Sequence, residues 1–321
     1  MATLPAGAVV LVTGASGFLG GHILTRLVGE NCTLHAVNRQ GLGPARGRVV
    51  WHAADLRVAD AALDLVRQVR PTHLLHNAWI AVPGRFWSDP ENLDWLQAGL
   101  ALLRGFGEVG GRRFVGVGTC AEYDWQQTCF IEDETPIRPA TLYGKSKAAM
   151  WAAAQAYGAC YGFSAAWGRI FLPYGPGDSA QRLIPMIFAS LLAERPVALG
   201  DGTQERDFIY APDVADLLVR LLVVVGDGAF NVGTGRGTEI GAVAGRIADR
   251  LGGRALLRFD AARAASEQPR RIVADMSKVG ERLGWFATGR LEDELEKLLD
   301  AAMTEHHARA AIDPSAKRSA G

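Results

Sequence analysis

The sequence has no long hydrophobic segment and no paired cysteines. None of its apolar runs approaches the roughly 20 residues that a helix needs to cross a bilayer, and residues 1–7 lack the basic start and apolar stretch of a signal peptide. The four cysteines form no C-x-x-C pair, and the seven histidines form no cluster with zinc-ligand spacing. We therefore expect a cytoplasmic protein with reduced thiols, no membrane attachment and no metal.

The sequence also lacks an excess of charge of either sign. Lys and Arg together number 34, and Asp and Glu together also number 34. Without a global electrostatic field, nothing favours binding to nucleic acid or to an acidic membrane. We expect a small-molecule partner whose charge is met by local side chains. The 321 residues suffice for one large domain or two of moderate size.

The stretch from Val9 to Gly20 organises the rest of the chain. Its β-branched run is typical of a strand buried on both faces of a parallel sheet. Three glycines follow at intervals of three residues. Gly14 would turn the chain, Gly17 would admit a pyrophosphate at a helix N-terminus, and Gly20 would let that helix pack against the strand. An ordinary turn before a helix is the alternative, and the preceding strand weighs against it.

This spacing resembles that of the short-chain dehydrogenase/reductase superfamily. The wording Gly-Ala-Ser-Gly-Phe-Leu-Gly resembles its extended branch, which includes nucleotide-sugar epimerases, dehydratases and reductases. The resemblance implies an α/β fold, with a Rossmann-type doubly wound parallel sheet and a smaller C-terminal substrate-binding lobe. It places the cofactor phosphates at a loop made of Gly14, Ser16, Gly17, Phe18, Leu19 and Gly20.

The end of the second expected strand, residues 33–37, indicates the cofactor. An acidic residue there accepts hydrogen bonds from the ribose hydroxyls of NAD, whereas a basic one accommodates the 2′-phosphate of NADP. The sequence has the neutral Asn38 and then Arg39, whose guanidinium can pair with a phosphate. We therefore expect both to contact the cofactor and NADP(H) to be favoured over NAD(H). The alternative is that Arg39 is an ordinary surface residue.

Ligand contacts are also expected after the third and fourth strands, because open α/β sheets bind ligands at the carboxyl edge. After the third strand, Asp55 resembles the family residue beside the adenine, although it could equally cap a helix. After the fourth strand, Trp79 contacts nicotinamide or substrate, or belongs to the core. The other expected contacts at these edges are Leu56, Asn77 and Ala78 for the cofactor and Ala81 for the substrate.

A hydroxyl and a Y-x-x-x-K pair carry the expected chemistry. Thr119 ends the fifth strand, and Tyr143 and Lys147 lie one turn apart on a helix. A nearby ammonium stabilises a phenolate, so we expect the pKa of Tyr143 to be lowered and Tyr143 to act as general acid and base. Thr119 would orient the reacting oxygen. The set resembles the Ser/Thr-Tyr-Lys triad of the superfamily, which also assigns the tyrosine and the lysine to the cofactor.

The residues after Thr119 narrow the reaction. The 4,6-dehydratases of the resembled family have Asp-Glu in the next two positions, where this chain has Cys120 and Ala121. Neither residue can act as the acid or base that expels water, so we expect no dehydratase. Cys120 is expected to be a buried thiol. Glu122 could face the substrate or be solvated, and we include it among the substrate contacts.

Two segments of the second half resemble the nucleotide-sugar branch. Residues 169–177 resemble the pattern R-x-x-N-x-Y-G-P-G, with Leu172 in place of the asparagine that usually touches the diphosphate. In residues 200–215, Arg206 on a short strand is the best candidate for a bidentate contact with that diphosphate. The remaining contacts that we expect are Pro173 for the cofactor and Arg182 and Arg271 for the substrate.

We expect residues 1–175 to form the cofactor-binding domain, with returns to its sheet near 204–232. Residues 176–303 would form most of the substrate lobe, and 304–321 a flexible polar tail. The helix 87–108 and the helix beginning at Tyr143 form a dimer interface in the resembled enzymes, so we expect a homodimer.

Together these features favour an NADP-dependent reductase acting on the 4-keto group of a nucleotide-linked hexose, most simply a 6-deoxyhexose. A nucleotide-sugar 4-epimerase with a tightly held cofactor is the alternative enzyme. A regulator that binds NADP without turnover is a third possibility, against which the complete triad argues.

Overall fold

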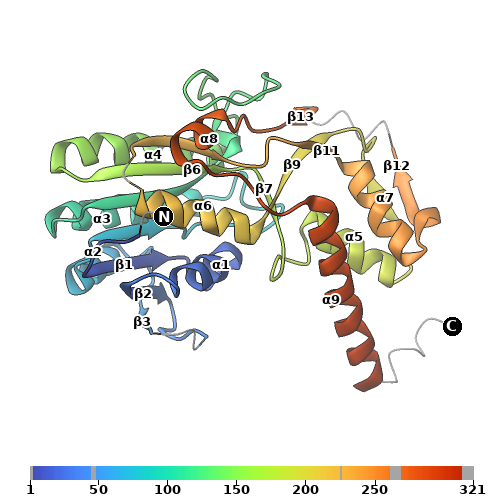
Figure 1. The fold of residues 1–321 in the computed structure, drawn as a ribbon, viewed down its shortest axis with the longest axis horizontal. Coiled ribbons are helices and arrows are strands. Elements are labelled where there is room, and N and C mark those ends of the chain that lie inside the picture. Colours follow the sequence, from blue (N-terminus) through green and yellow to red (C-terminus); the bar gives the residue numbers. More distant parts are fainter. Residues whose placement is uncertain (1–2, 45–47, 225, 261–268, 313–321) are drawn as a thin grey trace.

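The computed structural model describes residues 3–44, 48–224, 226–260 and 269–312 (Figure 1). Within them, parallel strands form one main sheet with the order β10-β6-β5-β4-β1-β2-β3. Consecutive strands run outward in both directions from the β1–β4 boundary, as the doubly wound prediction requires. The bounds are β1 (Ala8–Thr13), β2 (Cys32–Asn38), β3 (Val49–Ala53), β4 (His73–His76), β5 (Arg113–Thr119), β6 (Ser164–Ile170) and β10 (Gly228–Val232).

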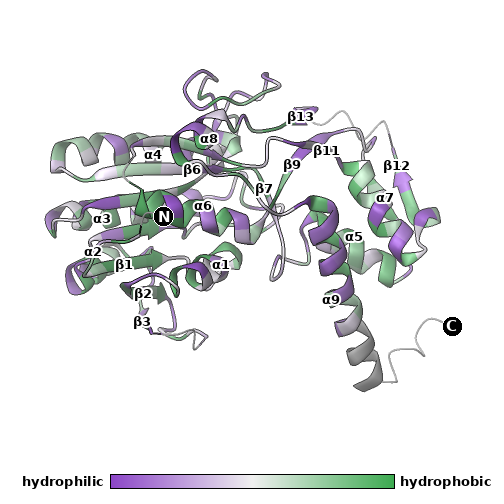
Figure 2. Cartoon of the chain, in the orientation of Figure 1, coloured by the Kyte–Doolittle hydropathy of each residue, from purple (hydrophilic) through white to green (hydrophobic). Residues whose placement is uncertain are grey.

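Helices cover both faces of this sheet (Figure 1). One apolar core joins the sheet to α2 (Ala59–Val69), α3 (Glu91–Glu108) and α4 (Leu142–Tyr161), and a second joins it to α1 (Phe18–Leu27), α6 (Ala211–Val223) and α8 (Ser277–Leu283). β1 is hydrophobic along most of its length because it is covered on both sides (Figure 2).

A smaller lobe lies beside the carboxyl edge of the sheet. Its own core involves α5 (Leu183–Leu192), α7 (Ile240–Leu251) and α9 (Leu291–Ile312), with the strand pair β8 (Val197–Leu199) and β12 (Leu257–Phe259). A second small sheet contains β7 (Leu172–Tyr174), β9 (Glu205–Tyr210), β11 (Gly237–Glu239) and β13 (Arg271–Ile272).

Two strands lie outside the sheet in which the expected division placed them. β7, placed within 1–175, and β9, placed in the returns near 204–232, pair with each other in the lobe rather than in the main sheet. Among the described residues, the chain returns to the main sheet with α6 and β10, and again with α8.

The expected tail is also corrected. Residues 304–312 continue α9 because they contain several strong helix formers, and acidic residues in the first turn of α9 favour its dipole. Residues 313–321 lie outside the described part. No helix among the described residues is long and apolar enough to span a bilayer.

Candidate active site

The glycine loop lies at the β1–β4 boundary and requires glycine. Gly14 has a φ of +65°, and a Cβ there would lie 2.7 Å from the backbone nitrogen of Ala78. The Oγ1 of Thr13 accepts the N–H groups of Asn77 and Ala78, each at 3.2 Å, and the Asn77 side chain donates to the Gly14 carbonyl at 3.1 Å. A Cβ at Gly20 would overlap the Gly14 carbonyl. The loop and the end of β4 therefore form one tightly packed unit.

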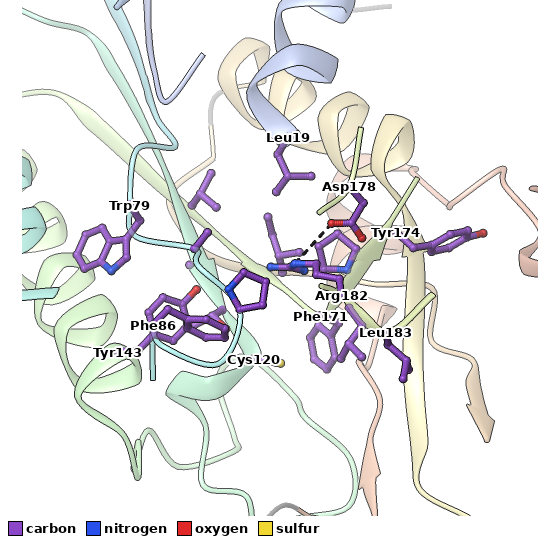
Figure 3. A pocket seen from close by; sticks show the side chains of 18 of the residues that line it. Leu19, Trp79, Phe86, Cys120, Tyr143, Phe171, Tyr174, Asp178, Arg182 and Leu183 are labelled. Carbon is purple, nitrogen blue, oxygen red and sulfur yellow. Dashed lines mark ion pairs between the residues drawn. The ribbon is translucent and has the colours of Figure 1, made fainter. Parts of the chain in front are cut away.

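The start of α1 fits a dinucleotide phosphate. Its N-cap is Gly17, which has no side chain to cap the first turn, an arrangement in which the N–H groups of that turn can meet an anion. Ser16 is exposed and Phe18 is half-buried. Leu19 reaches into the main cavity (Figure 3).

The adenosine end has no carboxylate at position 38. The side chain of Asn38 accepts the N–H of Gln40 at 3.0 Å and donates to the Leu42 carbonyl at 2.6 Å, so it shapes the loop after β2. The next residue, Arg39, is exposed. The arrangement leaves an exposed cation at the end of β2 without a ribose-binding acid.

Asp55 is not a helix cap. Its carboxylate accepts two hydrogen bonds from the Arg57 guanidinium, at 3.0 and 2.8 Å, while the N-cap of α2 is Val58. The hydrogen bond from Arg57 lowers the pKa of Asp55. Leu56 beside it is buried. The structure thus removes the cap alternative for Asp55.

Thr119, Tyr143 and Lys147 converge on one cavity. Thr119 ends β5, and the side chain of Thr141 accepts the N–H of Gly144 at 3.1 Å, which fixes the start of α4. The Lys147 ammonium donates to the Val117 carbonyl at 2.6 Å. The expected triad is therefore brought together by a strand end and the first two turns of a helix.

The expected direction of the Tyr143 pKa shift is wrong in this structure. Burial raises the pKa of Tyr143, and a hydrogen bond with Thr119 offsets only part of the increase. The Lys147 nitrogen is 6.0 Å from the centroid of the Tyr143 ring and is directed at the Val117 carbonyl. Burial lowers the pKa of Lys147 to about 7, against the opposing effect of Glu122. Tyr143 is therefore protonated at neutral pH.

The cavity has a volume of about 340 Å³ and two unlike ends (Figure 3). At the catalytic end, the rings of Phe86 and Trp87 lie edge-on to Tyr143, with centroids 4.9 and 5.9 Å away. Burial raises the pKa of Cys120 there to about 12, which confirms the expected buried thiol. Other expected residues that line the cavity are Asn77, Ala81, Leu172 and Pro173.

The lobe end of the cavity carries two of the predicted cations, and both are close enough to the catalytic end to act on it: Arg182 acts to lower the pKa of Tyr143, and Arg206 that of Cys120. Arg182 lies 3.5 Å from Asp178, and burial raises the pKa of that carboxyl to about 6. Arg206 is buried on β9, where its guanidinium donates to the Glu205 carbonyl and to the Gln204 side chain. Both arginines line the cavity. This end can accept an anionic group such as a diphosphate.

Two predicted substrate residues lie elsewhere. Glu122 is 0 % exposed, and its carboxylate accepts from Arg169, Trp167 and the backbone N–H of Thr119. It is neither solvated nor facing the cavity, because its oxygens are used inside the fold. Arg271 pairs with Glu205 at 3.0 Å and lines a neighbouring cavity.

Several cavity residues were not among our predictions. Phe86, Trp87, Trp125 and Asp178 all line the cavity. The sequence contains one usable signal: tryptophans 79 and 125 follow expected strands, and tryptophan 87 stands at the start of an expected helix. Asp178 offered no such signal, because an aspartate in a Gly-rich loop is common.

Comparisons with known proteins give relatives that match most of this chain. The chain is similar to UDP-glucose 4-epimerase from Azospirillum brasilense, with 27% identity over 92% of this chain and 91% of the relative. A solved structure of MoeE5 with UDP-glucose and NAD is 27% identical with a TM-score of 0.78, covering 92% of this chain and 99% of MoeE5. The NAD complex of UDP-glucose 4-epimerase from Thermus thermophilus is 26% identical with a TM-score of 0.78, covering 91% of this chain and 97% of that enzyme.

The family match covers most of the main domain. It extends over residues 10–233, which include the glycine loop, Thr119, Tyr143 and Lys147. The predicted resemblance to the extended short-chain dehydrogenase/reductases is therefore confirmed, and so is the expectation of an enzyme. The chain belongs to the NAD dependent epimerase/dehydratase family.

Proposed function

We propose that the chain reduces the 4-keto group of a nucleotide-linked hexose with NADPH. The observation that carries the proposal is that Tyr143 lies beside the Thr119 hydroxyl in a cavity that continues to two arginines. A ketone reduction needs a proton donor at the developing alkoxide, and a tyrosine phenol, which carries its proton at neutral pH, can serve as that donor. The test of this proposal is the isotope experiment described below.

Each catalytic side chain has a distinct task in this proposal. A bound nicotinamide would supply hydride to C4 of the hexose. Thr119 orients the carbonyl oxygen, Tyr143 donates its proton to that oxygen, and charged Lys147 stabilises the phenolate that is left. Asn77, Ala78 and the glycine loop hold the cofactor at the carboxyl edge of the sheet.

Relatives support a uridine diphosphate sugar as the substrate, and the cavity wall supports a 6-deoxy group on that sugar. MoeE5 binds UDP-glucose and UDP-glucuronic acid, and the relative from A. brasilense is a UDP-glucose 4-epimerase. At the catalytic end, Trp87 and Trp125 lie edge-on to each other at 5.9 Å and present apolar surface. Such a wall suits the methyl group of a 6-deoxyhexose better than a primary alcohol. Arg182 and Arg206 would hold the diphosphate.

NADPH should bind at least several-fold more tightly than NADH, because Arg39 can pair with the 2′-phosphate and no carboxylate at position 38 opposes it. The two affinities can be measured by fluorescence titration. Arg39→Asp should narrow or reverse the preference. As a control, Arg195→Asp makes the same change of charge at an exposed arginine after α5 and should leave the ratio unchanged. Equal wild-type affinities would refute this preference.

A 4-epimerase is the second candidate, and two observations favour it. Relatives that are similar over most of the chain are 4-epimerases. In addition, Leu172 lines the cavity where the family pattern has asparagine, so one diphosphate contact is missing and a keto intermediate could rotate more easily. A regulator without turnover stays the least favoured reading, because Thr119, Tyr143 and Lys147 lie together.

The two enzymatic readings differ in the fate of the hydride. A reductase given NADPH deuterated on the nicotinamide should consume it stoichiometrically and place deuterium at C4 of the product alcohol. The substrates to test are UDP- and dTDP-linked 4-keto-6-deoxyhexoses, and the products can be analysed by mass spectrometry and NMR. Interconversion of two 4-hydroxy epimers without net loss of cofactor would reject the reductase in favour of the epimerase.

We also propose a homodimer formed through α3 and α4. Leu93 and Leu100 on α3 are 55 % and 42 % exposed, and Tyr161 at the end of α4 is 56 % exposed. These apolar side chains on neighbouring helices would be covered by a second copy. Sedimentation analysis tests the assembly directly.

A further inference from the structure

Trp79 lies against the ammonium of the catalytic lysine. It follows β4 and lines the cavity, and the Lys147 nitrogen is 4.0 Å from the centroid of its ring. This is closer than the 6.0 Å to the Tyr143 ring and the 5.9 Å to the Trp167 ring. An aromatic face at this distance attracts a cation, and the attraction is strongest where water is excluded. Lys147 is only 2 % exposed.

Trp79 is itself held by a buried amide. Its indole N–H donates to Oδ1 of Asn92 at 2.9 Å. The Nδ2 of Asn92 donates to the carbonyls of Phe86 and Asp89, each at 2.8 Å. Asn92 is 0 % exposed and lies in the first turn of α3. Both sides of its amide are therefore used within the fold, which fixes its orientation.

The Asn92 side chain also holds the loop that packs against Tyr143. The loop whose carbonyls Asn92 holds carries Phe86 edge-on to Tyr143, at 4.9 Å between centroids. The carbonyl of Trp87, the next residue, accepts the backbone N–H of Tyr143 at 3.2 Å. One side chain thus connects to the lysine through Trp79 and to the tyrosine through the loop.

We propose that Asn92 and Trp79 are positioning residues of this active site: Asn92 fixes the indole of Trp79, and that indole keeps the Lys147 ammonium charged and facing the cavity. The inference rests on the proposed function for the role of Lys147. It assigns a task to Trp79, which in the sequence could equally have been a core residue. It also assigns one to Asn92, which does not line the cavity itself but contacts Trp79 and Phe86, which do.

The charge of Lys147 is set by opposing neighbours. Burial disfavours the ammonium, whereas Glu122, on the short helix after β5, favours it. His76, at the end of β4, stays neutral because burial lowers its pKa to about 3. Tyr143, on the same helix as Lys147, is protonated at neutral pH. The face of the Trp79 ring attracts the ammonium, so Trp79 and Glu122 both favour the charged form of Lys147.

The test measures the protonation of Lys147 without any substrate. Wild-type protein and variants are labelled with a trace of acetic anhydride across a range of pH, and mass spectrometry follows acetylation of the Lys147 peptide. Trp79→Leu should move the midpoint of Lys147 titration to lower pH by about one unit, the size expected for a desolvated cation–π contact. Trp79→Phe keeps an aromatic face and should restore part of the shift.

A double-mutant cycle tests the link through Asn92. Asn92→Leu should lower the midpoint in the wild-type background and have no further effect in the Trp79→Leu background, because it acts through the indole. Trp95→Leu removes a neighbouring indole on α3 and should leave the midpoint in place. Thermal unfolding of each variant confirms folding, and Trp79→Phe serves if Trp79→Leu does not fold.

An unchanged midpoint in Trp79→Leu, or equal effects of Asn92→Leu in both backgrounds, would overturn the inference. The predicted shifts together with no turnover of any 4-keto sugar would instead overturn the proposed function and leave the role of Trp79 and Asn92 intact.

Discussion

Tyr143→Phe should lower turnover by roughly 100-fold or more, the usual contribution of general acid–base catalysis, while the fold and the cofactor affinity stay as in the wild type. The reason is that Phe retains the ring contacts with Phe86 and Trp87 and removes only the hydroxyl beside Thr119. Single-turnover reduction of a verified 4-keto substrate, followed by NADPH fluorescence, measures the effect.

The control for this experiment lies on the same helix. Tyr161 ends α4 and is exposed, so Tyr161→Phe removes a hydroxyl without touching the cavity and should leave the rate unchanged. Wild-type rates in Tyr143→Phe would show that another group supplies the proton.

Glu122→Leu should destabilise the fold by about 3–5 kcal/mol, the cost typical of removing one partner from a buried ion pair. Arg169 is 2 % exposed and lies 2.9 Å from the Glu122 carboxylate, so the substitution leaves its charge buried without compensation. It also removes the acceptor of the Trp167 indole and of the Thr119 N–H. Urea unfolding followed by circular dichroism gives the change in unfolding free energy.

An exposed pair provides the comparison. Arg250 and Asp300 are 2.7 Å apart at the surface of the lobe, and Asp300→Ala should cost about 1 kcal/mol or less. The double variant Glu122→Leu/Arg169→Met should recover much of the loss, because no charge then stays buried. A cost for Glu122→Leu as small as that for Asp300→Ala would contradict the role of this pair.

The sequence predicted those features that depend on local pattern. Residues 33–37 were expected as a strand, and β2 spans Cys32–Asn38. The glycine loop and the Tyr143–Lys147 spacing were also predicted, because turn geometry and helical periodicity determine them within a few residues. The start of α3 was placed at 87, but Pro90 is its N-cap, and residues 83–88 form turns instead.

What could not be predicted depends on distant partners. Glu122 resembles any surface glutamate in sequence, and its burial follows from Arg169 and Trp167, more than forty residues away. The raised pKa of Tyr143 also depends on residues distant in the sequence, because burial within the fold causes it. Y-x-x-x-K spacing gives the position of the lysine along the helix, but it does not reveal that the ammonium contacts the Val117 carbonyl and the Trp79 ring.

The residues that line the cavity come from two parts of the fold, the main domain and the lobe in which β7 pairs with β9. Thr119, Tyr143 and Lys147 come from the main domain. Arg206 comes from β9 and Arg182 from the N-cap of α5, both in the lobe. If the proposed function holds, the reaction at the sugar and the recognition of the rest of the ligand are encoded by different stretches of the gene. Substitutions in the lobe would then change which donor is accepted without altering the residues of the proposed hydride chemistry.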